Sequence, residues 1–530
     1  MAVSVSEKPV TLVRATGVAA LVTLASSAFG IVRESLTAAR FGTSVETDVY
    51  FFSFGLVVLL PEFLQSATAA GLVPVYLRSK REGHSTVFIN TVINAYSLFL
   101  LGITVLGLVG LPLIVSILAS GFDAAGQQLV TRMILILSPT IVLSGVWGIL
   151  RSLLYAEGEI FRSTISTAFL SVSIIGAILL FSPHLGVYSL PVGILIASVL
   201  QLLWTGYWSG RHGIRHRFVL DWDEPSFQRF ITLLGPGLLG SVLLYMIPVI
   251  DRTMASHFPG GTIAALGFAG RPRNILSSLV IYSLVTALLP SFSQKALDLD
   301  RDSFRQSVAK TLGLLMFITT PLSLLVVILR VPLIQLLFER GQFGAAATLA
   351  TAGYFAADAI GLVPMAIAVT VSAIFNAVED TRTPAIFGAG INLLSKIVLN
   401  LLFVAAFGAI GLPLATSAMY VVSAVVLLRL LRRRLHGIEG DYLLRTLVSA
   451  LLATLVAMAP VYLLMAQWKN AAPLVMLITG TFVGSVLFIV AAATLRIPEL
   501  YMAREYFFKV INRKLRADYS RPREQSCGDV

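Results

Sequence analysis

Long apolar stretches separated by short polar connectors run the length of this chain. About fourteen of them are long enough to cross a bilayer as helices, which takes ~20 predominantly apolar residues. We therefore predict an all-α polytopic membrane protein. The predicted spans are 11–32, 47–76, 87–117, 129–150, 163–182, 187–208, 229–250, 264–290, 311–330, 347–378, 384–405, 411–428, 446–466 and 472–495.

The first six spans reappear, weakly, in the second six. The offset between matching segments grows slowly along the chain, as small loop insertions would cause, and matched spans keep the same orientation. A parallel repeat of this kind is typical of transporters and predicts a V-shaped cavity between two lobes. The matching pairs are 71–76 with 287–292, 155–159 with 376–380, and 185–186 with 410–411.

The repeat defines the predicted domain organisation. Two six-helix lobes are joined by the longest polar connector, and two further spans and a basic tail follow the repeat. The predicted parts are an N-lobe at 1–210, a cytoplasmic linker at 211–228, a C-lobe at 229–435, two extra helices at 436–496, and a cytoplasmic tail with an interfacial helix at 497–530.

Composition supports the membrane assignment and excludes several kinds of site. Hydrophobic residues make up 57% of the chain and charged residues 12%, whereas soluble proteins are about a quarter charged. The single cysteine, Cys527, excludes a disulfide framework and a multi-cysteine metal site. No P-loop, GxSxG or HExxH motif is present. We therefore assign no catalytic residue, metal or cofactor, and expect transport to use an ion gradient, the membrane potential or another subunit's ATP.

The net charge of +12 first suggests nucleic-acid binding, but its distribution argues against that partner. About three quarters of the Lys and Arg residues fall on the side of the membrane that holds the N-terminus, and positive residues stay cytoplasmic during insertion. Both termini are therefore expected in the cytoplasm, with basic runs near anionic lipid headgroups. A basic amphipathic helix is predicted over 498–516. No small-residue cleavage site follows the polar start, so a retained first helix is expected.

Ionisable residues at membrane depth are the main candidates for function, because burying a charge costs several kcal/mol or forces pairing. Arginine pairs bidentately with phosphate, so these residues favour a phosphorylated headgroup over a cationic drug. Interfacial anchors or structural ion pairs are the alternative. The first span either ends at Arg33 or continues as a tilted helix to Arg40. The residues are Arg33, Glu34, Asp48 and Glu62 in the N-lobe, and Asp251, Arg252, Arg271, Arg273 and Lys396 in the C-lobe.

Five ordered segments resemble the MurJ/MviN lipid II flippases of the multidrug/oligosaccharidyl-lipid/polysaccharide exporter superfamily. The resemblance implies a multi-pass protein of the bacterial inner membrane that moves an undecaprenyl-diphosphate-linked sugar between leaflets during peptidoglycan synthesis. It also implies contact with membrane lipids and possible cell-envelope synthesis enzymes. The segments are 47–54 (TDVYFFSF), 250–256 (IDRTMAS), 288–291 (LLPS), 338–343 (FERGQF) and 380–384 (DTRTP).

The family's cavity arginines carry over only in part. The resemblance places one on Arg33, followed by the family's acidic residue at Glu34, and another on Arg271. Two more fall on Ser27 and near Leu60, which are not basic. The acidic residue of the second span falls near Gln65, one turn from Glu62, which could substitute. The candidate substrate-binding set is Arg33, Glu34, Asp48, Glu62, Arg271 and Arg273.

A second departure concerns ion coupling. Some family members are described as holding sodium between an acidic residue of span 7 and Asn/Asp residues one turn apart in span 11. The corresponding positions here resemble Asp251, Asn392 and Lys396. We predict that the Lys396 ammonium takes the place of the cation and pairs with Asp251. The alternative is a lysine that faces lipid and snorkels to the interface.

The thinned arginine set leaves other functions open. A flippase for another undecaprenyl-linked glycan, such as O-antigen or exopolysaccharide, is the closest alternative to a lipid II flippase. A cation-coupled drug exporter of the same superfamily would need an acidic, aromatic cavity. A non-transporting scaffold that recruits envelope enzymes would need no functional cavity.

Overall fold

The computed structural model describes residues 9–286, 292, 301–380, 382–468 and 471–505, and this part of the chain contains helices and no strand. The helices of the first half are α1 (Pro9–Phe41), α2 (Val45–Glu82), α3 (Ser85–Val109), α4 (Leu111–Leu118), α5 (Ala124–Leu137), α6 (Pro139–Ala156), α7 (Ile160–Ile165), α8 (Ala168–Leu185), η1 (Gly186–Tyr188), α9 (Ser189–Arg211) and α10 (Pro225–Ala255). Those of the second half are α11 (Thr262–Leu276), η2 (Ser277–Tyr282), α13 (Arg301–Phe338), α14 (Ala345–Ala359), α15 (Leu362–Ala377), η3 (Pro384–Ala389), α16 (Gly390–Phe407), η4 (Gly408–Ile410), α17 (Gly411–Arg434), α18 (Gly440–Gln467) and α19 (Pro473–Thr494).

The predicted all-helical membrane fold is confirmed. Eight helical segments of the described chain are long and apolar enough to cross a membrane, or nine if α14 and α15, which meet at a 45° bend, form one span. Two of these segments, 160–211 and 384–434, contain an internal break at η1 and η4. The count of fourteen spans stays a prediction.

The chain forms two compact units, each assembled from separate segments. The first comprises 1–275, 333–358 and 381–422, and the second 276–332, 359–380 and 423–530. These units are defined by packing, whereas the predicted lobes are defined by the sequence repeat. The division into repeat lobes stays a prediction.

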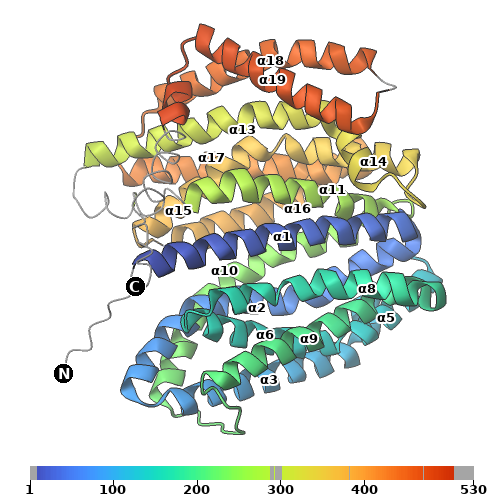
Figure 1. The fold of residues 1–530 in the computed structure, drawn as a ribbon, viewed down its shortest axis with the longest axis vertical. Helices are drawn as coiled ribbons and strands as arrows, with labels where there is room; N and C mark the ends of the chain where they lie inside the picture. Colours follow the sequence, from blue (N-terminus) through green and yellow to red (C-terminus); the bar gives the residue numbers. More distant parts are fainter. Residues whose placement is uncertain (1–8, 287–291, 293–300, 381, 469–470, 506–530) are drawn as a thin grey trace, which may run out of the picture. The chain divides into compact units, whose positions relative to one another are not determined.

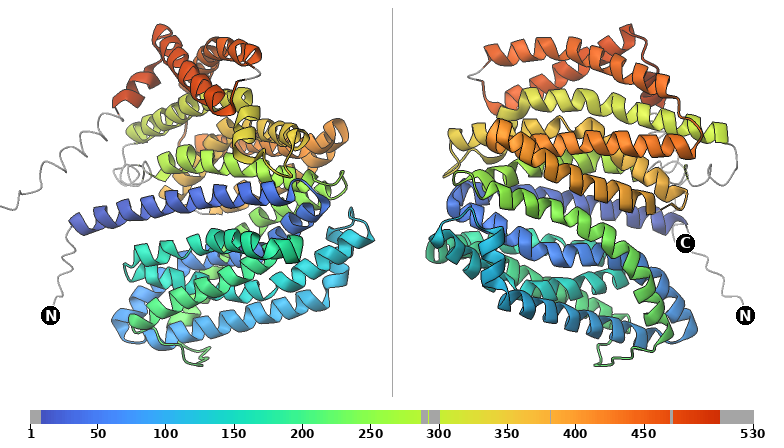
Figure 2. Two further views of the ribbon diagram at one scale, coloured as in Figure 1. Left: turned by 45° about the vertical axis from the view of Figure 1, so that its right-hand side comes forward. Right: turned by 180° about the vertical axis from the view of Figure 1, so that it is seen from behind.

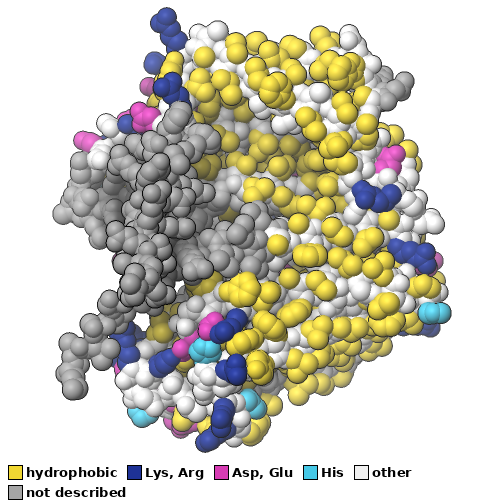
Figure 3. Space-filling view, in the orientation of Figure 1, with side chains coloured by type: hydrophobic (Ala, Val, Ile, Leu, Met, Phe, Trp, Pro, Cys, Tyr) yellow, Lys and Arg dark blue, Asp and Glu magenta, His cyan; other side chains and the backbone are white. Residues whose placement is uncertain are grey.

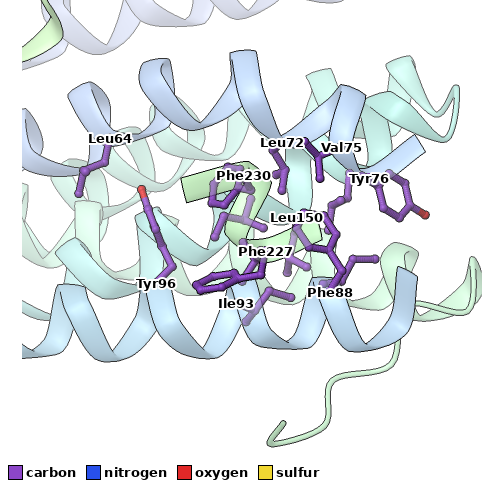
Figure 4. Packing of buried hydrophobic residues seen from close by; sticks show 14 of the residues in the cluster. Leu64, Leu72, Val75, Tyr76, Phe88, Ile93, Tyr96, Leu150, Phe227 and Phe230 are labelled. Atoms are coloured by element: carbon purple, nitrogen blue, oxygen red, sulfur yellow. The ribbon is translucent and has the colours of Figure 1, made fainter. Parts of the chain in front are cut away.

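The first unit is a bundle in which α2 is central. α2 packs against α6 and α10, α6 against α9, and α9 against α8, and α2, α6 and α9 run side by side in Figure 1. Its core is visible in Figure 4, where Phe88 of α3 and Phe230 of α10 meet edge to face with centroids 6.3 Å apart. Edge-to-face ring contacts of this kind contribute to the close packing between these helices.

The second unit has its own apolar clusters. One joins α13, α15 and the end of α17 through Phe304, Phe375 and Leu431, all buried. Another places Phe317 of α13 against Phe488 of α19, with ring centroids 5.1 Å apart. The helices α18 and α19 pack against each other, as both views of Figure 2 show.

The outer helices of the first unit expose apolar side chains. Figure 3 shows hydrophobic atoms over the visible face of α8 and α9, with charged side chains toward the helix ends. On α3 and α4, Leu106, Val109 and Leu113 are 71%, 77% and 65% exposed. A surface of this kind is stable only when lipid covers it.

Two sequence expectations can be placed on the helices. α1 continues to Phe41, so Arg33 lies within a long helix, as the longer version of the first span expects; where this span leaves the membrane stays a prediction. Residues 498–505 are helical, whereas the rest of the predicted interfacial helix and the segment 288–291 lie outside the described residues.

Candidate functional site

A cavity of about 600 Å³ lies within the first unit, with walls from α2, α10, α11, α14, α16 and α17. Five of the nine predicted site residues line it: Glu62, Asp251, Arg271, Arg273 and Asn392. Two further charged residues, Arg252 and Asp358, also line it. The cavity therefore collects ionisable side chains from helices far apart in the sequence.

Arg33, Glu34 and Arg271 form one charged cluster beside this cavity. Nη2 of Arg33 and Nη2 of Arg271 each lie 2.8 Å from Oε1 of Glu34. The Arg33 and Glu34 side chains are 10% and 5% exposed, whereas that of Arg271 is 37% exposed. Arg271 is thus the member that faces the cavity, and Glu34 holds it there while Arg33 balances the buried carboxylate.

Arg273 is paired with a residue that we did not predict. Its Nε lies 2.8 Å from Oδ2 of Asp358 at the end of α14. Both side chains are largely buried, at 21% and 13% exposure. Asp358 is an acidic residue inside the apolar stretch 347–378, and that position was the sequence signal for it. The pair leaves Arg273 with its charge balanced by the protein itself.

Lys396 of α16 is fully buried, so the lipid-facing alternative is wrong. Its Nζ lies 3.1 Å from Oδ1 of Asp251 and donates to the Leu412 carbonyl at 2.9 Å and to Oγ1 of Thr416 at 2.5 Å. An ammonium group has three donors, and three oxygens surround this one. The predicted ion pair with Asp251 is present, within an oxygen-lined cage that α10, α16 and α17 build together.

The asparagine of this cage is Asn400, not the predicted Asn392. Nδ2 of Asn400 donates to Oδ1 of Asp251 at 2.8 Å. Asn392 lines the cavity instead, and its Oδ1 has no hydrogen-bond partner in the described part of the chain. Both asparagines lie one turn from Lys396 on the same helix face, so spacing alone could not distinguish them.

Asp48 does not line this cavity. Its two carboxylate oxygens accept hydrogen bonds from the backbone amides of Gly261 and Ala264, each at 2.6 Å. These amides are among the free donors at the start of α11, where a carboxylate is favourable. The structure therefore gives Asp48 a helix-capping role, and it is not brought together with the other candidate residues.

A second cavity of about 690 Å³ adjoins the first, and the two share Phe54, Val58, Glu62 and Tyr245. Its lining is rich in hydroxyl and amide groups and includes Arg151, whose guanidinium lies 5.3 Å from the centroid of Trp147. Glu62 forms no ion pair within the described chain. It therefore presents a free carboxylate to both cavities.

Comparison with known proteins places the chain in a family. The family described as lipid II flippase MurJ matches residues 37–482. A protein of Synechocystis named probable lipid II flippase MurJ is 26% identical over 81% of this chain and 83% of its own. The lipid II flippase MurJ of Thermosipho africanus is 28% identical over 77% of this chain and 83% of its own. A Rickettsia prowazekii protein named probable lipid II flippase MurJ is 26% identical over 95% of this chain and 99% of its own.

Solved structures agree with these sequence matches. A lipid II flippase MurJ in an inward closed conformation has a TM-score of 0.78 and 25% identity, and the match covers 90% of this chain and 98% of that one. An inward-facing multidrug transporter of the MATE family has a TM-score of 0.63 at 14% identity, over 78% of this chain and 94% of its own, which indicates a shared fold alone. The chain belongs to the lipid II flippase MurJ family.

Proposed function

We propose that this protein moves lipid II, the undecaprenyl-diphosphate-linked peptidoglycan precursor, from the inner to the outer leaflet of the bacterial cytoplasmic membrane by alternating access. The observation that carries this proposal is the family match over residues 37–482. The arginine-containing cavity supports it, because guanidinium groups bind phosphate oxygens in a bidentate geometry.

In this proposal the headgroup enters the cavity while the polyprenyl chain stays in the bilayer. Arg271, held by Glu34, contacts the diphosphate, and Arg33 supports this contact from behind without lining the cavity. Arg273 lines the same cavity, but Asp358 balances its charge, so Arg271 is the stronger of these two arginine contacts with the diphosphate. The membrane potential can drive the step, since moving one charge is worth ~2.3 kcal/mol per 100 mV.

We further propose the repeat lobes, 1–210 and 229–435, as the moving parts, with both termini in the cytoplasm. Symmetry-related lobes that rock about a shared site are the usual basis of alternating access. Cell-envelope synthesis enzymes on the two sides of the membrane are the proposed partners, because lipid II has to be supplied on one side and consumed on the other.

The cage around Lys396 supports a proposal about coupling. Its ammonium lies among Asp251, Leu412 and Thr416 oxygens, which are the ligand types that hard cations prefer. We propose that the lysine provides a permanent positive charge there and that transport requires no bound sodium ion.

Complementation of a strain depleted of its own lipid II flippase tests the function. We expect this chain to restore growth and lipid II turnover, with immunoblots of the membrane fraction as the expression control. Failure to rescue at normal abundance would overturn the lipid II assignment. Purified protein in liposomes then separates the alternatives: flipping of another undecaprenyl-linked glycan indicates a different cargo, and absence of any flipping indicates a scaffold.

A further inference from the structure

We propose that Arg252 is the principal phosphate-binding group of the first cavity and that Gly55 of α2 positions its guanidinium. This inference rests on the proposed transport of a diphosphate lipid and names a residue for it outside the predicted substrate-binding set. Arg252 lies on α10 directly after Asp251, and both line the cavity.

Arg252 differs from the other arginines of the cavity in its lack of a carboxylate partner among the described residues. Three arginines line the first cavity among the described residues, at 252, 271 and 273. Arg271 is bound to Glu34 and Arg273 to Asp358, each at 2.8 Å. The Arg252 guanidinium makes neither an ion pair nor a hydrogen bond with any described residue. It therefore keeps its donors for a ligand.

The neighbouring carboxylate does not neutralise Arg252 by direct contact. Oδ1 of Asp251 forms an ion pair with Nζ of Lys396 at 3.1 Å and accepts a hydrogen bond from Nδ2 of Asn400 at 2.8 Å. Because these two partners hold the Asp251 side chain in the cage, it forms no ion pair with the adjacent Arg252. Lys396 thus has a second effect, which is to leave Arg252 as an unpaired cation.

Gly55 determines where this cation lies. A Cβ added at Gly55 would be 2.0 Å from Cζ and Nη1 of Arg252 and 2.5 Å from its Nε. The guanidinium therefore lies directly against the α2 backbone at Gly55, in a space that the side chain of any other residue would fill. Gly55 also lines the cavity, so the close contact presents the Arg252 donors at the wall where α2 and α10 meet.

The chemistry of the site fits a diphosphate. A half-buried guanidinium with five free N–H donors gains most from an anion that accepts several hydrogen bonds in one plane. Arg271 lines the same cavity and has a partly exposed side chain, so two cationic groups are available to a ligand that carries two linked phosphates. A sugar or a peptide without phosphate groups does not offer two linked anionic groups to these two arginines.

Binding of undecaprenyl diphosphate to the purified full chain in detergent tests the proposal, with undecaprenyl monophosphate as the comparison ligand. We expect Arg252→Ala and Gly55→Ala each to weaken diphosphate binding about tenfold or more, equivalent to about 1.4 kcal/mol, and to weaken monophosphate binding less. The double variant should bind no more weakly than Arg252→Ala, because Gly55 acts through the arginine. Arg252→Lys should recover part of the affinity, since a lysine keeps the charge but not the planar fork.

Two matched controls separate this effect from general damage. Arg132→Ala removes an exposed charge from α5, and Gly176→Ala adds a methyl group in α8 where nothing lies within 4 Å. Both should bind as the wild type does. Size-exclusion profiles and unfolding temperatures establish folding, and Arg252→Gln, which is shorter and uncharged, replaces any alanine variant that fails to fold.

Wild-type affinity in Arg252→Ala, or a further loss in the double variant beyond Arg252→Ala, would overturn the proposal. Its outcome is separable from that of the proposed function. Failed complementation with Arg252-dependent diphosphate binding removes lipid II as cargo and leaves the site intact. Successful complementation with unchanged binding in Arg252→Ala removes this site and leaves the function.

Discussion

Nζ of Lys396 lies 3.1 Å from Oδ1 of Asp251, and the lysine side chain is fully buried whereas that of the aspartate is 28% exposed. The two partners therefore differ in what remains when the other is removed. A buried cation without its counter-ion has no access to water, whereas a partly exposed carboxylate keeps some.

Removing Asp251 should cost more stability than removing Lys396. Asp251→Asn leaves the enclosed ammonium without a negative charge, and loss of one partner of a buried pair costs about 3–5 kcal/mol. Lys396→Met leaves a carboxylate that still accepts from Asn400 and reaches the cavity. Thermal and denaturant unfolding in detergent would measure both variants. A larger loss in Lys396→Met contradicts the asymmetry.

Replacing the lysine with a carboxylate should create a requirement for sodium. Lys396→Asp adds an oxygen ligand to a cage that already has the Leu412 carbonyl, Thr416 hydroxyl and Asp251 carboxylate, and removes the cation that fills it. Flipping in liposomes should then rise with sodium concentration, whereas wild-type flipping should not. Lys310→Asp, at an exposed position of α13, is the control. Equal ion dependence in wild type and Lys396→Asp argues against a substituted cation.

Loss of Arg271 should abolish transport with the fold retained. In Arg271→Ala the Glu34 carboxylate keeps its contact with Arg33 at 2.8 Å, so no buried charge is left without a partner. The cavity, however, loses the one guanidinium of this cluster that lines it. Flipping in liposomes should fall to background while membrane abundance and the unfolding temperature stay near wild type. Full activity in this variant would remove Arg271 from the substrate site.

Acidification should weaken the interaction of Glu157, at the end of α6, with Lys80 and Tyr76 of α2. Lys80 donates to both oxygens of Glu157, at 2.5 and 2.6 Å, and Tyr76 also donates to Glu157. Burial raises the pKa of Glu157, but these hydrogen bonds and the charge of Lys80 outweigh it, so the pKa lies below its ordinary value. A carboxyl group whose pKa is lower in the folded state stabilises the fold at pH values above its unfolded-state pKa of about 4.3. That contribution disappears as the pH falls through the folded value.

Unfolding temperatures of Lys80→Met measured between pH 7 and pH 3.5 test this interaction with Glu157. The variant should be less stable than wild type at neutral pH, by a small amount because Lys80 is half exposed. The difference should shrink as Glu157 becomes protonated. Arg78→Met, which breaks an exposed pair with Glu82, is the control. A difference that stays constant down to pH 3.5 excludes the Glu157 contribution.

Much of this site could be predicted because buried charge is rare in apolar helices and therefore conspicuous in the sequence. The pairing of Asp251 with Lys396 followed from that rarity together with the family resemblance. Arg33, Glu34 and Arg271 were identified, although nothing in the sequence indicates that both arginines contact a single carboxylate oxygen.

The errors have local physical causes. The apolar surroundings of Asp48 in the sequence predict a place in the site, yet it lies in the first turn of α2, where its carboxylate accepts hydrogen bonds from backbone amides at the start of α11. Asn392 and Asn400 each lie four residues from Lys396, so helical spacing places both on its face and does not tell which one contacts Asp251. Arg252 could not be distinguished because its importance depends on the interactions that hold Asp251.

The FERGQF segment also has a mechanical explanation in the structure. Gly341 has φ +58°, and a Cβ on it would lie 2.2 Å from the Ala39 carbonyl oxygen, while the Gln342 amide donates to that same oxygen at 2.8 Å. The glycine of this motif is therefore explained by the close approach of two backbone segments, and this role involves no contact with a transported molecule. As sequences in the family diverge, it should remain a fixed reference point for alignment even in homologues whose transported molecule has changed.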